Sequence, residues 1–150
     1  MRRSSSTTDT DRALSRQLLD TIPHIMRAIR GTLRDVNAAS LTVPQFRVLA
    51  FVSLQSCTNN QLADWQGVSL PAMSRMVDYL VRRHLLVRIP DRVDRRRVQL
   101  RLSKKGRAEF EALHRAVQFR LAERIMGLSA KQKASLAVGL NVLRKLFSEK

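Results

Sequence analysis

Apolar residues recur at steps of three and four along most of the chain, which is the spacing of one face of an α-helix. The longest stripe covers roughly residues 12–37 and predicts a long first helix, which Pro23 either kinks or divides. Later stripes predict five further helices that open at Thr42, Thr58, Ser69, Ser103 and Ser129. Gly67 predicts a tight turn before the fourth helix, and Gly127 ends the fifth.

Three of these helices begin with the same short pattern, a Ser or Thr followed three residues later by Gln. In such a capping box each side chain accepts a hydrogen bond from the other residue's free backbone N–H. The pairs are Thr42 with Gln45, Thr58 with Gln61 and Ser129 with Gln132. A short capped helix, a turn at Gly67 and a further helix together form the order of a helix-turn-helix motif, at residues 59–84.

After His84 the helical spacing gives way to alternation. Leu86 and Ile89 precede a polar run at residues 90–97, and Val98, Leu100 and Leu102 follow it with polar residues between them. Alternation on both sides of a polar run is typical of a β-hairpin. The predicted fold class is therefore mainly α, a winged helix-turn-helix with a small β-hairpin as its wing.

Composition indicates a soluble globular chain with an unusual charge. The 150 residues are 44% hydrophobic and carry a formal net charge of +16. A single cysteine, Cys57, excludes an internal disulfide and fits a reducing cytoplasm. No stretch approaches the roughly 18 consecutive apolar residues that span a bilayer, and the basic, Ser/Thr-rich start lacks the apolar run of a signal peptide. A charge of this sign and size favours a polyanion as partner, either nucleic acid or an anionic membrane surface.

The positive charge is concentrated in residues 71–107, which hold twelve Lys or Arg and three acids. On the fourth helix the spacing places Ser74, Arg75, Asp78 and Arg82 on one side, away from the apolar stripe. That side can enter a major groove, although a charged face of this kind also occurs on ordinary solvated helices. Arginines at a hairpin tip suit a narrow minor groove, whose negative potential attracts guanidinium groups.

Residues 88–106, RIPDRVDRRRVQLRLSKKG, resemble the wing of the MarR family of bacterial regulators, with its strand, Asp-x-x-Asp-Arg-Arg tip, returning strand and Ser-x-x-Gly helix start. The entry to the second helix at residues 41–49 and the Leu-Ser at 128–129 extend the resemblance over about residues 22–147. It implies a DNA-binding domain at 41–102 and a helical dimerisation region formed by 11–40 and 103–150, whereas the polar start of the chain indicates a disordered tail at 1–10. Apolar stripes at both chain ends favour the same homodimer.

The resemblance also implies roles for individual residues. Arg95 would insert into the minor groove, and Asp94 would orient the wing arginines, Arg96 among them. The residues expected to face the major groove are Pro71, Ala72, Ser74 and Arg75, with Thr58 and Gln61 near phosphates. Pro71 and Met73 depart from the small hydroxyl or β-branched residues of many relatives, so no base preference is transferred. Tyr79 is also unusual for the outer face.

The sequence therefore predicts a sequence-specific double-stranded DNA-binding regulator that acts as a repressor, bound to a palindromic operator as a homodimer. A basic module that binds nucleic acid without reading its sequence, and a helical adaptor for an acidic protein, stay open as alternatives. The resemblance further implies a small aromatic or amphipathic effector, for which His24, Arg27 and Phe46 are the candidates. The competing interpretation makes His24 and Arg27 surface groups and Phe46 a core residue.

Catalytic and metal chemistry find little support in the sequence. The three histidines, His24, His84 and His114, are widely spaced and form no metal-ligand pattern with the single cysteine. No phosphate-binding glycine loop or nucleophile elbow is present, so we expect neither an enzyme nor a cofactor. Cys57 allows a redox-sensing interpretation, but its place between the second and third helices favours an ordinary structural thiol.

Overall fold

The computed structural model describes residues 8–36, 41–90 and 98–148. Within these ranges the chain is mainly helical with one antiparallel pair of strands, so the predicted fold class is confirmed. The elements are α1 (Asp9–Asp35), α2 (Val43–Leu54), α3 (Asn59–Gln66), α4 (Leu70–Arg82), β1 (Leu86–Pro90), β2 (Val98–Leu102), α5 (Lys104–Met126) and α6 (Ala130–Ser148).

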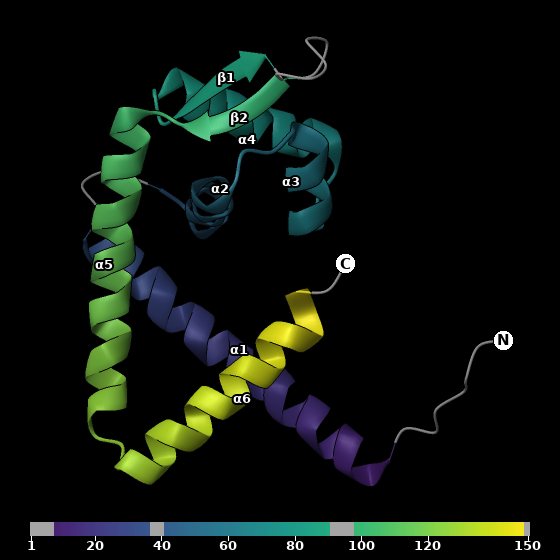
Figure 1. Cartoon of the computed structure of the whole chain (residues 1–150), viewed down its shortest axis with the longest axis vertical. Coiled ribbons are helices and arrows are strands. Elements are labelled where there is room, and N and C mark those ends of the chain that lie inside the picture. The colour runs from purple at the N-terminus through teal and green to yellow at the C-terminus, as the bar shows by residue number, and fades with distance from the viewer. Residues whose placement is uncertain (1–7, 37–40, 91–97, 149–150) are drawn as a thin grey trace, which may run out of the picture.

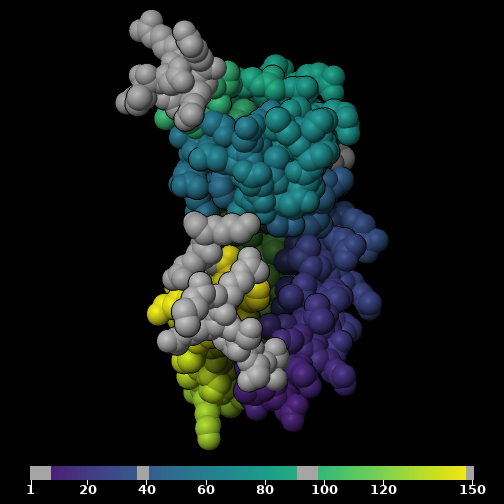
Figure 2. Space-filling model, turned by 90° about the vertical axis from the view of Figure 1, so that its right-hand side faces the viewer, coloured from purple at the N-terminus to yellow at the C-terminus, as the bar shows by residue number. Residues whose placement is uncertain are grey.

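Helices α2, α3 and α4 and the two strands gather into one lobe, and α5 descends from it toward α6 (Figure 1). The space-filling view shows the lobe as a rounded body, with α1 and α6 below it (Figure 2). The lobe contains most of the core, because the apolar stripes of its helices face one another and the inner face of the hairpin. Its fully buried side chains include Leu49, Leu62, Met73, Val77, Leu80, Leu86 and Leu100.

All three predicted capping boxes are present. Thr42, Thr58 and Ser129 each donate a backbone N–H to the side chain of Gln45, Gln61 and Gln132 at 2.9 Å, and each accepts the Gln N–H in return. Gly67 ends α3 with a φ of 68°, in the left-handed region that glycine adopts without steric cost. Local sequence alone therefore determines where these helices begin and how the turn between α3 and α4 is made.

Helix α1 was predicted only in part. It runs unbroken through Pro23, so the alternative in which the proline marks a new helix start is wrong. It also begins at Asp9, where Thr8 and Asp11 form a further capping box. Residues 9 and 10 thus belong to the helix, so the predicted tail 1–10 extended too far. The polar residues at its end form the cap and first turn of the helix. Residues 1–7 lie outside the described residues.

The hairpin is joined to the lobe and to α5 through the turn at His84. His84 has a φ of 58°, the left-handed conformation that side chains other than glycine rarely adopt. Its carbonyl accepts a hydrogen bond from the Ser103 hydroxyl, and the Ser103 Oγ in turn accepts the N–H of Gly106 at 2.9 Å as the cap of α5. The turn after α4 and the start of α5 are therefore one connected unit.

Replacing His84 with glycine is expected to raise the free energy of unfolding by about 0.5 kcal/mol. An L-residue in the left-handed region costs about 1–2 kcal/mol, and the greater freedom of glycine in the unfolded chain offsets about 0.4–1 kcal/mol of that gain. Urea denaturation measures the change. His84→Ala is the control, because it removes the imidazole and keeps Cβ; a gain of equal size in both variants would contradict the backbone explanation.

Candidate nucleic-acid interface

Helix α4 lies against α3 in the arrangement that the helix-turn-helix motif requires. Leu62 and Ala63 of α3 and Met73 and Val77 of α4 are buried between them and the rest of the lobe. The amide of Asn59 donates a hydrogen bond to the Ser74 hydroxyl at 3.2 Å. Ser74 is half-buried and helps to hold α4 on α3, a contact that the sequence analysis did not foresee.

The residues of α4 that were predicted to face DNA are partly exposed and partly half-buried. Pro71, Arg75 and Arg82 are exposed, whereas Ala72 is half-buried like Ser74. Among the described residues no acid lies within ion-pair distance of Arg75 or Arg82. These two guanidinium groups are therefore the cations that α4 presents to solvent.

Asp78 also lies on this side, but it is engaged by the hairpin. Arg88 of β1 donates a charge-assisted hydrogen bond to the Asp78 carboxylate. Both side chains are partly exposed, so the pair adds about 0–1 kcal/mol to stability. Its greater effect is geometric, because it joins the recognition side of α4 to the first strand of the wing.

Tyr79 was predicted on the outer face of α4, but it does not lie there. Its ring is half-buried against the core, and its hydroxyl accepts a hydrogen bond from Arg83 at 3.3 Å. The Arg83 guanidinium also lies 5.8 Å from the ring centroid and 4.0 Å from the Glu109 carboxylate of α5. The prediction failed because the apolar stripe of α4 is wider than its strictly apolar residues indicate.

Thr58 and Gln61 occupy the start of α3, where their side chains are used in the capping box. Gln61 Oε1 accepts hydrogen bonds from the Thr58 N–H at 2.9 Å and from the Thr58 hydroxyl at 3.3 Å. These residues hold the N-terminus of α3 in place, and the positive end of a helix dipole favours a nearby anion. Whether they contact phosphate directly stays a prediction.

Asp94, Arg95 and Arg96 lie outside the described residues. The strands around them are paired in antiparallel register from Leu86 opposite Leu102 to Pro90 opposite Val98. Residues 91–97 therefore connect the two strands at the hairpin end remote from α5. The predicted strands of the hairpin are confirmed, and the position and roles of the three residues stay predictions.

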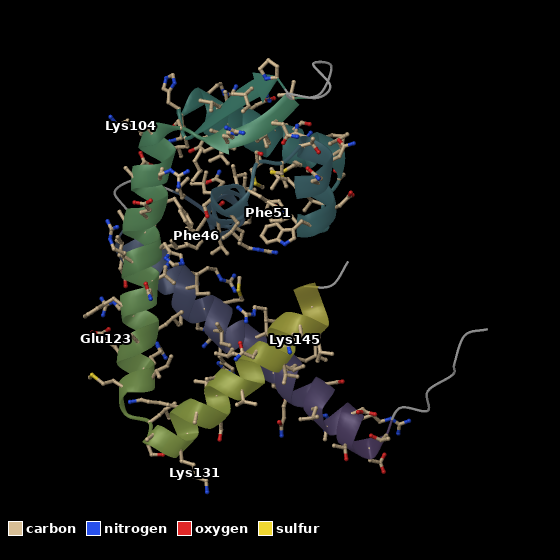
Figure 3. The ribbon with its side chains drawn as sticks, viewed as in Figure 1. Phe46, Phe51, Lys104, Glu123, Lys131 and Lys145 are labelled. Atoms are coloured by element: carbon tan, nitrogen blue, oxygen red, sulfur yellow. The ribbon has the colours of Figure 1, made fainter. Side chains whose placement is uncertain are left out.

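The three residues proposed for an effector site do not meet. Phe46 is a core residue between α2 and α5, with its ring 5.6 Å from that of Phe110 (Figure 3). His24 and Arg27 line a groove of about 740 Å³ between α1 and α5. The competing interpretation of Phe46 was correct, since an aromatic residue near the start of an apolar helix is most often needed for packing.

A larger groove, of about 1130 Å³, lies between α1 and the start of α2. Arg27 belongs to this groove as well, together with Arg30 and Arg34 of α1 and Arg47 of α2. Arg30, Arg34 and Arg47 were not among the predicted residues. The spacing of Arg27, Arg30 and Arg34 by three and four residues along α1 was a signal for a shared face, but Arg47 comes from α2, whose position only the fold determines.

Cys57 has the structural role that the sequence favoured. Its side chain is buried, and burial raises the pKa of the thiol to about 11. Its backbone pairs with Leu100 of β2, so it joins the lobe to the hairpin. A thiol with so high a pKa is almost entirely protonated at neutral pH and is a poor nucleophile.

Further searches cover only the part of the chain that the structure describes. There, no group of three or more His, Cys, Asp or Glu side chains is placed to hold a metal ion. None of the described helices combines the length and the apolar character needed to cross a membrane.

Comparison with known proteins gives a consistent result. Residues 39–97 match the model of the MarR family. RV1404 from Mycobacterium tuberculosis is similar in fold, with a TM-score of 0.82 and 24% identity over 97% of this chain and 98% of that one. Wild-type MarR from E. coli, in its apo form, has a TM-score of 0.72 and 28% identity over 89% and 96% of the two chains. FabT from Streptococcus pneumoniae, solved in complex with DNA, has a TM-score of 0.73 and 20% identity over 91% and 96%. No curated protein matches the sequence.

A short α3, a left-handed turn, an exposed basic α4 and a hairpin tied to it define a winged helix-turn-helix protein. The family match lies on this same region and the whole fold agrees with it. Residues 39–97 thus match the MarR family, and the described chain has the winged-helix fold of solved MarR proteins.

Proposed function

We propose that this protein is a regulator rather than an enzyme, a repressor that binds a palindromic operator as a homodimer and reads its sequence. The observation that carries the proposal is the exposed basic side of α4, fastened to the wing by the pair of Asp78 with Arg88. A helix of this kind fits the major groove of B-DNA, and a hairpin beside it can reach the adjacent minor groove. FabT, which shares the fold, was solved with DNA bound.

In this proposal the residues of the interface divide between reading and positioning. Arg75 contacts a base edge, and Pro71, Ala72 and Ser74 pack close to it at the groove. Arg95 enters the minor groove, and Asp94 orients Arg95 and Arg96 by pairing with them. Thr58 and Gln61 fix the start of α3 beside the phosphate backbone. Phosphate contacts place the protein, and only the base contacts specify sequence.

The dimer is proposed from apolar surface that the single chain leaves uncovered. Several large apolar side chains of α1, α5 and α6 are more than one third exposed: Leu14, Leu19, Ile22, Ile25, Phe119, Met126, Leu140, Leu146 and Phe147. Large apolar side chains exposed along three helices favour burial against a partner. We therefore assign residues 11–40 and 103–150 to dimerisation and residues 41–102 to DNA binding, with α1, α5 and α6 as the interface.

Two-fold symmetry then determines the shape of the operator. Two copies of α4 should lie about 34 Å apart, in successive major grooves on one side of the duplex. An imperfect inverted repeat with half-site centres about one helical turn apart is the expected binding site. A small aromatic or amphipathic ligand is proposed to relieve binding.

Arg75→Ala is expected to weaken binding to the operator by roughly 1–3 kcal/mol and to relax base choice at one position of each half-site. Fluorescence anisotropy on operator and random duplexes at fixed salt measures both effects. Arg115→Ala on α5 is the matched control, because it removes an exposed arginine remote from α4.

The charge of +16 also favours a second candidate, a basic module that binds nucleic acid without reading its sequence. The same experiment separates the two. Equal loss of affinity on operator and random DNA would make Arg75 a phosphate contact and would support the non-specific candidate.

A further inference from the structure

The hydroxyl group of Ser74 is bonded differently from other shielded hydroxyls of the protein. Among the described side chains, three hydroxyl residues within helices are not exposed to solvent: Thr32, Ser53 and Ser74. Thr32 and Ser53 donate their hydroxyl hydrogen to a carbonyl of their own helix, at 3.0 and 2.7 Å, as hydroxyls inside helices commonly do. The Ser74 oxygen instead accepts a hydrogen bond from Nδ2 of Asn59, at 3.2 Å.

This bond leaves the hydrogen of the Ser74 hydroxyl available. A serine hydroxyl has one hydrogen to donate and two lone pairs that accept. Asn59 supplies the hydrogen of the bond between the two residues, and no described group accepts the hydrogen of Ser74. Ser74 lies beside Arg75 and one turn from Pro71, on the side of α4 proposed to enter the major groove. It therefore has a donor to offer on that side.

The opposite orientation of the Asn59 amide is less favourable. Oδ1 of Asn59 is buried and accepts no hydrogen bond from the described part of the chain. If the amide were turned over, Nδ2 with its two hydrogens would occupy that buried position without an acceptor. A buried carbonyl oxygen without a partner is tolerated more readily than a buried N–H without one. The amide is therefore held with its nitrogen toward Ser74.

The start of α3 fixes Asn59 in this place. Asn59 is the first residue of α3 and directly follows the N-cap Thr58. The capping box of Thr58 with Gln61 holds the backbone on both sides of Asn59, through hydrogen bonds of 2.9 and 3.3 Å. A side chain anchored at the beginning of α3 thus determines how a hydroxyl on α4 is bonded.

We propose that Asn59 is a positioning residue for base reading, which keeps the Ser74 hydroxyl as a hydrogen-bond donor and so makes Ser74 require an acceptor on the base edge. In the major groove guanine, adenine and thymine present acceptors, whereas cytosine presents only the N4 donor. A serine hydroxyl that is free to rotate suits either kind of edge. With Asn59 in place, cytosine at this position leaves the Ser74 hydrogen unpaired, which costs free energy. This role of Asn59 rests on the DNA reading proposed above.

Asn59→Asp tests the role with little change of shape. A carboxylate only accepts hydrogen bonds, so the Ser74 hydroxyl should turn and donate to Asp, and Ser74 then presents only lone pairs to DNA. The preference against cytosine is expected to fall about three- to tenfold, the range of one hydrogen bond. Fluorescence anisotropy on four duplexes that differ at one position of the half-site measures it. That position is the one at which Ser74→Ala removes the base preference.

Asn60→Asp is the matched control, because it adds the same charge one residue further along, at an exposed side chain. Both variants should lose affinity for all four duplexes, since the added negative charge opposes binding to phosphate. Only Asn59→Asp should change the ratio between the bases, and in a Ser74→Ala background the two variants should behave alike. Equal base ratios in the two single variants would overturn the positioning role, while the proposed function would stand.

The contact itself is tested in the free protein, without DNA. Urea denaturation of Asn59→Ala, Ser74→Ala and the double variant gives their effects on the unfolding equilibrium constant. The double variant should unfold about threefold less readily than the product of the two single effects predicts, because either change alone removes the same hydrogen bond. Asn60→Ala combined with Ser74→Ala should show simple multiplication. Independent effects of Asn59→Ala and Ser74→Ala would overturn the contact.

The DNA measurements also separate this role from the proposed function. If Ser74→Ala leaves the base preference unchanged at every position while Arg75→Ala alters it, Ser74 contacts phosphate or packs, and the positioning role is wrong. A parent protein that binds all duplexes equally would contradict the proposed function itself, and with it any base contact of Ser74.

Discussion

Replacing Gly106 with alanine is expected to lower the free energy of unfolding by about 3 kcal/mol or more, a large fraction of the stability of a small protein. A Cβ at this position would lie 1.9 Å from the carbonyl oxygen of Leu85 and 2.7 Å from its carbon. Both are backbone atoms held in place, since the same carbonyl accepts the Ser103 N–H at 3.0 Å. The chain has to move at the point where the wing joins α5, and chemical denaturation measures the cost.

Gly127→Ala is the matched control, because a Cβ there meets no atom within 4 Å and the φ of −73° is ordinary for alanine. Its free energy of unfolding should stay within about 0.5 kcal/mol of the parent. Similar losses in the two variants would mean that the contact between Gly106 and Leu85 does not hold the hairpin to α5.

Replacing Leu140, Leu143 and Leu146 of α6 together with glutamine is expected to convert the proposed dimer to monomer and to weaken operator binding by roughly a hundredfold or more. The three residues follow one another at steps of three along a helix whose apolar side chains are largely uncovered in the single chain. A monomer engages one half-site and loses the gain of linking two. Analytical ultracentrifugation and anisotropy on the same samples measure both effects.

The double variant of Lys131 and Lys145 to glutamine controls for a change of composition in α6, since both lysines are exposed. It should remain a dimer. A triple leucine variant that still sediments as a dimer would place the subunit contact elsewhere than on α6.

Features of the sequence that act locally were predicted well. A capping box is complete within four residues, so Thr42, Thr58 and Ser129 mark helix starts whatever lies around them. The turn at Gly67 and the alternation on both sides of residues 90–97 are equally local. These signals were sufficient for the helix-turn-helix, the hairpin and hence the fold class.

Features that depend on packing between elements were not predicted. The pair of Asp78 with Arg88 needs the angle between α4 and β1, which the nine intervening residues do not reveal. The half-buried Tyr79 packs against the core, and Phe46 packs on Phe110 of α5 rather than beside His24. The predicted effector residues His24, Arg27 and Phe46 do not line one groove, since the walls of a groove come from segments that are distant in sequence.

Selection of bound sequences from a random pool of duplex DNA tests the central proposal most directly. The exposed side of α4, the wing beside it and the uncovered apolar faces of α1, α5 and α6 together predict an enriched inverted repeat, with half-site centres about 34 Å apart along the duplex. Arg75→Ala should reduce the base preference at one position of each half-site. Recovery of pools with no common sequence, bound as tightly as the starting DNA, would contradict a sequence-specific dimeric regulator.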